Sequence, residues 1–143
     1  SLIGFAILSI EKGKGIELMI SSTLIGVLIG FLIYNFNPSS IFMGDSGCYF
    51  LGFILAYLAL SFTTFHPWSA FIGPVFIIGM PVLDAAYAIL RRLKKGVSPF
   101  KGDRTHFYDQ LMGKGLTTRQ TVMICYGIQL VLISLGVTLY LFI

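Results

Sequence analysis

Charged residues are scarce in this sequence. Asp, Glu, Lys and Arg make up 11% of its 143 residues, whereas 56% of the residues are hydrophobic and the mean hydropathy is +0.87. Soluble domains carry about 25% charged residues. The scarcity of charge therefore excludes an ordinary soluble domain and indicates an integral membrane protein.

Cysteine and tryptophan are scarce as well. The two cysteines, Cys48 and Cys125, fall within expected helices and lack the spacing of a metal site, so we interpret them as small apolar side chains. They offer no basis for redox or zinc chemistry. The single tryptophan, Trp68, lies between two apolar runs and fits the aromatic belt at a membrane boundary.

Long uncharged runs are what the sequence has in place of charge. Four of them come close to the roughly 20 residues that cross a bilayer as a helix. A fifth run, Ser1 to Ile10, rises only about 15 Å as a helix and is expected to be a partial helix. Because the chain opens without Met, we expect it to be the C-terminal portion of a longer protein. The predicted fold class is all-α, a polytopic membrane protein with four full transmembrane helices. The four runs are Leu18 to Tyr34, Cys48 to Phe65, Ala70 to Leu90 (interrupted by Asp84) and Gln120 to Ile143.

Positive charge gathers in one segment. The net charge is +4, and eight of the ten Lys and Arg residues lie between Arg91 and Arg119, in a loop between two spans. This concentration argues against nucleic-acid binding, and the positive-inside rule places the loop in the cytoplasm. Alternation of the spans then puts the loop of residues 35–47 on the same face. We predict a single transmembrane domain over residues 1–143 in the plasma (inner) membrane, with cytoplasmic loops at about 35–47 and 91–119.

Local signals refine this outline. Pro74 and Pro81 predict a kink in the third full span. Asp103 could cap a short interfacial helix from Arg104 to Met112. Thr117 to Gln120 has the spacing of a capping box that starts the last span. One face of the interfacial helix is expected to carry Phe107, Tyr108, Leu111 and Met112.

One carboxylate stands at a membrane boundary. The stretch from Asn35 to Gly47 reads Asn-Phe-Asn-Pro-Ser-Ser-Ile-Phe-Met-Gly-Asp-Ser-Gly and places Asp45 between two glycines where an uncharged run resumes. Acids so close to a span are costly and usually functional, and a helix starting at Ser46 would favour an anion there. A carboxylate suits Mg²⁺, which takes one or two of them together with phosphates and waters. The pattern suggests phosphoryl transfer, although a simple capping role for Asp45 stays open.

A second polar group belongs to the other predicted cytoplasmic segment. Asp84 lies seven residues before Arg91, about 10 Å deeper along a helix and on the same face. An ion pair between the two and a contact between Asp84 and substrate are both open. Beside Asp103, Arg104 and His106 offer donors for phosphate oxygens, although a lone loop histidine is more often simply solvated.

These residues resemble a known family, the polyprenyl-phosphate N-acetylhexosamine-1-phosphate transferases. Residues 35–47 are similar to the family's signature Asn-x-x-Pro-(small)-x-x-Phe-Met-Gly-Asp-(Ser/Thr)-Gly. Pro81-Val-Leu-Asp84, Arg91-Arg92 and the stretch from Ser98 to His106 are similar to the branch that uses UDP-N-acetylglucosamine. The resemblance covers essentially the whole chain.

The resemblance implies an activity. A sugar 1-phosphate, expected to be N-acetylglucosamine 1-phosphate, would pass from a UDP-sugar to a polyprenyl phosphate such as undecaprenyl phosphate. The products would be a polyprenyl-diphosphate-sugar and UMP, at the start of cell-envelope glycan synthesis such as that of lipopolysaccharide or teichoic acid. The resemblance also implies Mg²⁺, with Mn²⁺ as an alternative, and a membrane setting. Nucleic acid is not expected as a partner, and a homodimer is left open.

The family's site residues carry over position by position. Asp45 would hold the metal and act as a catalytic residue together with His106 and Asn35. The expected substrate-binding residues are Arg104, Asp103, Asp84, Gly44 and Ser46.

Two departures from the family pattern matter. The family's paired aspartates and its Asn/Asp-Gly-rich loop would lie upstream of Ser1, so this chain alone is expected to be inactive. The family's His-x-His-His motif reads His106-Phe-Tyr-Asp109 here, and whether Asp109 replaces a histidine is open.

A transporter or channel is the alternative, with Asp84 and the proline-broken helix lining a path. That function needs polar residues near the middle of several helices. The sequence instead concentrates its polar residues at one predicted face, which favours an interfacial enzyme. A purely structural subunit would not explain the signature of residues 35–47. The sequence does not identify the sugar, the lipid length or the glycan pathway.

Overall fold

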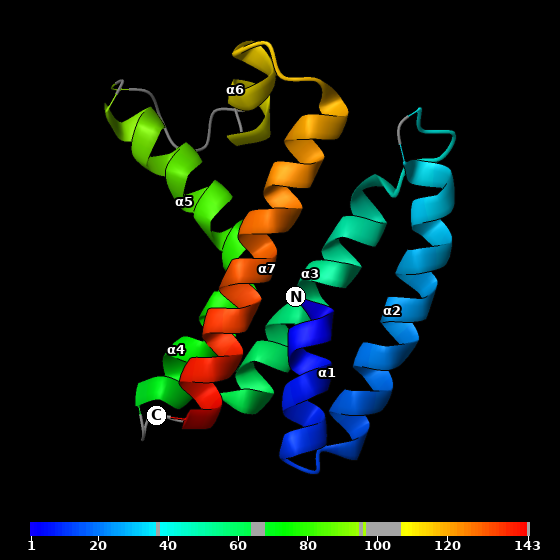
Figure 1. Ribbon diagram of the computed structural model, residues 1–143, viewed down its shortest axis with the longest axis vertical. Coiled ribbons are helices and arrows are strands. Elements are labelled where there is room, and N and C mark those ends of the chain that lie inside the picture. The colour runs from blue at the N-terminus through cyan, green and yellow to red at the C-terminus, as the bar shows by residue number, and fades with distance from the viewer. Residues whose placement is uncertain (37, 64–67, 95, 97–106, 143) are drawn as a thin grey trace.

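The computed structural model describes residues 1–36, 38–63, 68–94, 96 and 107–142. Three residues predicted for the site, Asp103, Arg104 and His106, therefore lie outside the described residues. The described part of the chain is helical and contains no strand, which confirms the all-α fold class (Figure 1). Its helices are α1 (Leu2–Glu11), α2 (Gly15–Asn35), α3 (Gly44–Phe62), α4 (Trp68–Ile77), α5 (Gly79–Lys94), α6 (Phe107–Gly113) and α7 (Thr118–Phe142).

The predicted membrane spans are present as helices. By length and composition, α2, α3 and α7 can each cross a bilayer, and α4 with α5 can form a fourth, broken span. The uncharged run at the start of the chain forms the short apolar helix α1. These findings confirm a polytopic membrane protein.

The break between α4 and α5 bends this helix pair by 81°. Pro81, in the first turn of α5, has no N–H to donate to the carbonyl oxygen of Ile77 four residues earlier, and Pro74 lies inside α4, so the kink predicted from these two prolines is present. The side chain of Gln129 on α7 satisfies the backbone at the break: its Nε2 donates to the carbonyl oxygen of Ile77 at 2.9 Å, and its Oε1 accepts from the N–H of Met80 at 3.1 Å. Backbone groups freed within an apolar layer require such partners.

A close crossing joins α4 to α7. A Cβ atom added at Gly73 would lie 2.9 Å from the carbonyl oxygen of Gly136, and one added at Gly136 would lie 2.7 Å from the carbonyl oxygen of Gly73. Small residues let membrane helices approach until their backbones touch. The crossing therefore requires glycine on both helices.

The apolar core lies where α1, α4 and the C-terminal ends of α3 and α7 meet. The rings of Phe5 and Phe62 stack with centroids 6.0 Å apart, and Tyr140 meets Phe62 edge-on at the same centroid distance. Leu8 and Leu58 are fully buried beside these rings. This half of the molecule is thus more tightly packed than the half that carries the candidate site.

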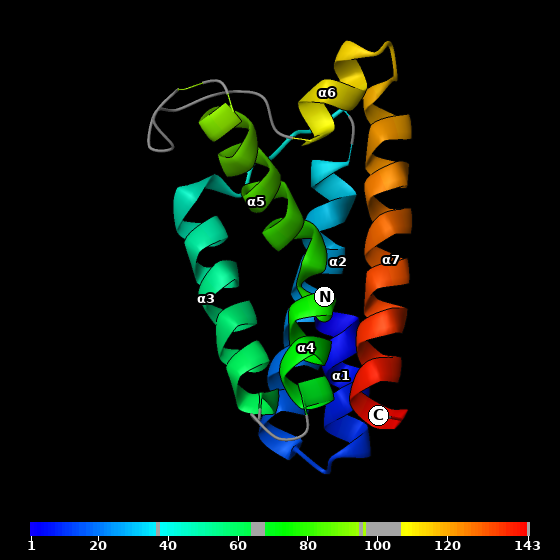
Figure 2. The same ribbon diagram turned by 90° about the vertical axis from the view of Figure 1, so that its left-hand side faces the viewer.

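The two segments predicted to share a face lie at the same end of the molecule (Figures 1 and 2). The connection between α2 and α3 is at the end where α5 finishes, α6 lies and α7 begins. The predicted capping box is also there: Thr117 Oγ1 accepts from the N–H of Gln120 at 3.3 Å, and Gln120 Oε1 accepts from the N–H of Thr117 at 2.9 Å. The polar segments are therefore gathered at one end of the helices.

Candidate functional site

The signature loop folds back onto the end of α2. The side-chain Nδ2 of Asn35, the last residue of α2, donates to the carbonyl oxygen of Ile41 at 2.8 Å. The backbone N–H and the hydroxyl of Ser40 both donate to the carbonyl oxygen of Tyr34 at 2.9 Å. The bonds to Tyr34 satisfy a carbonyl group that has no partner within the helix, and all three bonds fix the path of the chain toward α3.

Two glycines shape the entry into α3. Gly44 has a φ of +68°, a left-handed conformation that glycine adopts without a steric penalty. A Cβ atom on Gly47 would lie 2.5 Å from the Cγ of Met43, so the Met43 side chain occupies the space that a larger residue would need. Both glycines that flank Asp45 are therefore explained by the local backbone.

Asp45 lies in the first turn of α3 and is exposed. The helix begins at Gly44 rather than at the predicted Ser46, and Met43 occupies the N-cap position. Asp45 is thus inside the helix, which corrects the alternative that it serves as the N-cap residue. Its carboxylate has no hydrogen-bond or ion-pair partner among the described residues. An exposed acid in a first turn is stabilised by the helix dipole and stays available to a ligand.

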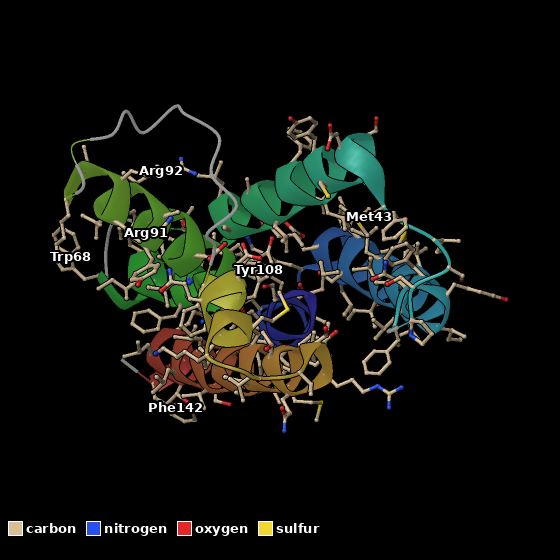
Figure 3. The ribbon with its side chains drawn as sticks, turned by 90° about the horizontal axis from the view of Figure 1, so that it is seen from above. Met43, Trp68, Arg91, Arg92, Tyr108 and Phe142 are labelled. Atoms are coloured by element: carbon tan, nitrogen blue, oxygen red, sulfur yellow. The ribbon has the colours of Figure 1, made fainter. Side chains whose placement is uncertain are left out.

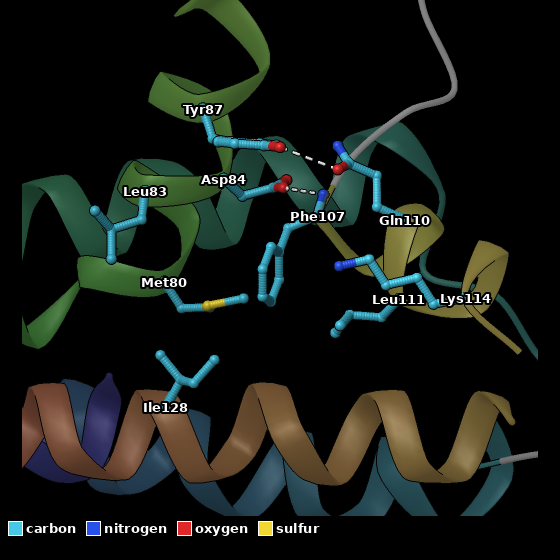
Figure 4. Close-up of a pocket in the computed structure, with 9 residues that line it drawn as sticks. All are labelled: Met80, Leu83, Asp84, Tyr87, Phe107, Gln110, Leu111, Lys114 and Ile128. Atoms are coloured by element: carbon cyan, nitrogen blue, oxygen red, sulfur yellow. Dashed lines mark hydrogen bonds between the residues drawn. The ribbon is translucent and has the colours of Figure 1, made fainter. Parts of the chain in front are cut away.

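Asp84 has a partner that the sequence did not suggest. Its Oδ1 accepts a hydrogen bond of 2.8 Å from the backbone N–H of Phe107, the first residue of α6 (Figure 4). One turn further along α5, the hydroxyl of Tyr87 donates to Oε1 of Gln110 at 3.0 Å. The two bonds attach α6 to α5.

A pocket of about 410 Å³ lies between α5, α6 and α7. Its walls are mainly apolar, and the polar groups of Asp84, Tyr87, Gln110 and Lys114 are on the α5 and α6 sides (Figure 4). Such a pocket can hold an apolar chain that carries a polar group at one end. The lining residues are Met80, Leu83, Asp84, Tyr87, Phe107, Gln110, Leu111, Lys114 and Ile128.

The residues predicted to share one face of the interfacial helix have different surroundings. Phe107 and Leu111 line the pocket, whereas Tyr108 and Met112 are exposed. Gln110, which bonds to Tyr87, also lines the pocket. The predicted cap Asp103 and the predicted helix start at Arg104 lie outside the described residues. Within the described residues, α6 begins at Phe107.

The carboxylates near α6 affect a neighbouring phenol. Partial burial raises the pKa of Tyr108, and the negative charges of Asp109 and Asp84 raise it further. The phenol therefore stays protonated at neutral pH.

The signature loop and the α5–α6 group are separate in this structure. In the end view, Tyr108 lies between Arg91 on one side and Met43, which precedes Asp45, on the other (Figure 3). Asp45 does not line the pocket beside Asp84. Among the described residues, no three His, Cys, Asp or Glu side chains come together as a metal site. The structure thus places Asn35, Gly44, Asp45 and Ser46 together, in the signature loop and the start of α3. It connects Asp84 to α6 instead.

Sequence reasoning missed the pairing of Tyr87 with Gln110. The two residues are 23 positions apart, on helices separated by a loop. Helical spacing rules relate residues three or four positions apart, so no signal in the sequence could have joined this pair.

Comparison with known proteins identifies the class. Residues 1–63 match the family model described as glycosyl transferase family 4. A probable undecaprenyl-phosphate N-acetylglucosaminyl 1-phosphate transferase of Bacillus subtilis is 36% identical over 126 residues, which cover 85% of this chain and 34% of the relative. The chain therefore belongs to this family of membrane transferases, as the signature predicted.

Other relatives carry similar names. The decaprenyl-phosphate N-acetylglucosaminephosphotransferase of Mycobacterium tuberculosis H37Rv is 37% identical over 122 residues, or 76% of this chain and 30% of the relative. The undecaprenyl-phosphate alpha-N-acetylglucosaminyl 1-phosphate transferase of Escherichia coli K12 is 36% identical over 99 residues, or 68% of this chain and 27% of the relative. The chain spans about a third of the length of these curated relatives. No solved structure matches the chain significantly.

Proposed function

We propose that this protein, as part of a longer polypeptide, transfers N-acetylglucosamine 1-phosphate from a UDP-sugar to a polyprenyl phosphate and releases UMP. The observation that carries the proposal is the exposed position of the Asp45 carboxylate. The folded signature loop holds this carboxylate exposed and without a partner among the described residues, at the first turn of a spanning helix. The names of the relatives support the sugar phosphate and the polyprenyl acceptor.

The donor chemistry at Asp45 fits a divalent cation. Mg²⁺, or Mn²⁺ in its place, takes hard oxygen ligands and usually needs only one or two protein carboxylates beside substrate phosphates. Asp45 would hold the ion, whose charge would neutralise the diphosphate of the UDP-sugar. Asn35 has a supporting role, because its Nδ2 is bonded to Ile41 and keeps the loop in place.

The chemical step is an in-line phosphoryl transfer. A phosphate oxygen of the lipid attacks the phosphorus bonded to the sugar, the bond from this phosphorus to the bridging oxygen breaks, and UMP leaves with that oxygen. Gly44 and Ser46 would place backbone N–H groups of the α3 start near phosphate oxygens. By family resemblance, Asp103, Arg104 and His106 would contact the substrate from the other loop.

The membrane setting follows from the same proposal. Both polar loops would lie on the cytoplasmic side of the inner membrane. The UDP-sugar, which is water-soluble, would reach them from the cytoplasm. Part of the polyprenyl chain would lie in the mainly apolar pocket between α5, α6 and α7. The scheme needs one copy of the chain, and a homodimer stays a prediction.

Replacement of Asp45 by Asn tests the proposal in the full-length protein. The measurement is Mg²⁺-dependent UMP release from UDP-N-acetylglucosamine with undecaprenyl phosphate as the acceptor. We expect turnover to fall by at least about 100-fold, because a group that stabilises transition-state charge is lost. Glu17→Gln is the matched control, since Glu17 is an acid in the first turn of α2 at the opposite end. Turnover of Asp45→Asn close to that of Glu17→Gln would rule out the metal role.

A further inference from the structure

A small pocket lies where α2 ends and α7 begins. Its volume is about 210 Å³. It is separate from the pocket between α5, α6 and α7, with which it shares no lining residue. It is lined by Leu32, Asn35, Phe36, Ser39, Thr118, Arg119, Val122 and Tyr126.

The lining of this pocket changes from polar to apolar with depth. Thr118 and Arg119 are the first residues of α7, and Asn35 is the last residue of α2. Val122 and Tyr126 follow Thr118 at four-residue intervals, so they lie on the same side of α7, about 6 and 12 Å deeper. Because both helices can span a bilayer, their ends lie near the headgroups and the deeper residues near the acyl chains. The pocket therefore matches the polarity of a lipid molecule that lies along it.

The polar end of the pocket is suited to an anion. Arg119 contributes a cation, and none of the described residues that line the pocket is acidic. A guanidinium group presents several donors in one plane and binds phosphate through two of them. Ser39 also lines the pocket and carries a hydroxyl group that can donate. Basic pockets between membrane helices bind anionic lipid headgroups.

We propose that the pocket between the ends of α2 and α7 binds the phosphate headgroup of an anionic phospholipid through Arg119. The acyl chains run along Val122 and Tyr126 toward the middle of the bilayer. This site does not depend on the proposed transferase activity. It lies next to the signature loop, however, because Asn35 lines the pocket and also holds Ile41.

Native mass spectrometry of the full-length protein tests the headgroup contact, with phosphatidylglycerol and phosphatidylcholine as probes. We expect the wild type to retain phosphatidylglycerol in preference to phosphatidylcholine. Arg119→Gln should lower the retention of phosphatidylglycerol by at least about tenfold, because the charge-assisted hydrogen bonds of the guanidinium group to the phosphate are lost. Arg92→Gln removes the same charge from α5, outside both pockets, and should leave retention unchanged. An equal loss in both variants would show general charge attraction and overturn the site.

Two further arms examine the apolar wall and the source of the phosphate. Val122→Trp fills the pocket without a change in charge and should reduce phosphatidylglycerol retention, whereas Met123→Trp introduces the same side chain at an exposed neighbour and should not. Unchanged retention in Val122→Trp would contradict the proposal. An excess of inorganic phosphate should fail to displace the lipid. Displacement would show a site for soluble anions and would overturn the lipid assignment.

Discussion

Asp84, in the middle of α5, accepts a hydrogen bond of 2.8 Å from the backbone N–H of Phe107, the first residue of α6. The bond joins two segments that are 23 positions apart across the basic loop. It satisfies a helix-start N–H that has no partner within its own helix. Because His106 directly precedes Phe107 in the sequence, Asp84 anchors the chain next to the histidine that family resemblance places near the substrate.

Removal of this acceptor should loosen α6. In Asp84→Ala, the N–H of Phe107 loses its partner, at a cost of about 1–3 kcal/mol. We expect amide exchange at Phe107 to accelerate by roughly 10- to 100-fold, measured by hydrogen–deuterium exchange in detergent. Asp84→Asn keeps an acceptor oxygen and should retain most of the protection. Equal exchange in the wild type and Asp84→Ala would show that the bond does not hold α6.

The helix break should depend on Gln129. Gln129→Leu deprives the carbonyl of Ile77 and the N–H of Met80 of their partner. Hydrogen bonds between membrane helices contribute on average about 0.6 kcal/mol and at most about 1.7 kcal/mol, so the two together should lower the free energy of unfolding by roughly 1–3 kcal/mol. The measurement is unfolding in mixed micelles of increasing denaturing detergent content.

A matched control for Gln129 lies on the same helix. Among the described residues, the Ser134 hydroxyl bonds to Leu130 alone, one turn earlier on α7, so Ser134→Ala should change stability very little. A similar loss of stability in both variants would mean that the effect of Gln129 does not depend on its bonds at the break.

Substitution of Gly44 at the start of α3 should be more costly than substitution of Gly52 within the helix. Gly44→Ala forces a residue with a Cβ into the left-handed region, at a cost of about 1–2 kcal/mol. We expect lower stability and, because Asp45 follows directly, weaker Mg²⁺-dependent UMP release by the full-length protein. Gly52→Ala is the control, since a Cβ there meets nothing within 4 Å. Unaltered turnover and stability in Gly44→Ala would contradict the conformational requirement.

The clash at Gly47 offers a rescue experiment. Gly47→Ala should disturb the start of α3, because its Cβ would lie 2.5 Å from the side chain of Met43. The additional change Met43→Ala removes the obstructing atoms and should restore thermal stability toward that of Met43→Ala alone. Failure of the second change to rescue the first would mean that another contact excludes a side chain at position 47.

The features predicted correctly from sequence are local ones. Uncharged runs of sufficient length identified the spans, because the cost of charge in a bilayer depends on composition along a single helix. The capping box of Thr117 and Gln120 was also predictable, since its two bonds connect residues three positions apart. Pro74 and Pro81 marked the broken helix pair through their missing N–H groups.

The features that sequence could not provide are contacts between distant segments. Gln129 reaches the break from 52 positions away, and Asp84 reaches Phe107 across the loop. The pocket face of α6 was not predicted, because the bond between Gln110 and Tyr87 that helps to form it joins two separate helices. Spacing along one helix contains no information about which partner helix lies opposite.

The contact of Gly73 with Gly136 has a mechanical consequence for the site. Backbones in direct contact leave α4 little freedom to slide against α7, so α4 and α7 form a fixed base. The 81° break, which Gln129 bridges, then determines the tilt of α5 relative to this base. A small rotation of α5 at the break would therefore move Asp84, and with it Phe107, relative to α7.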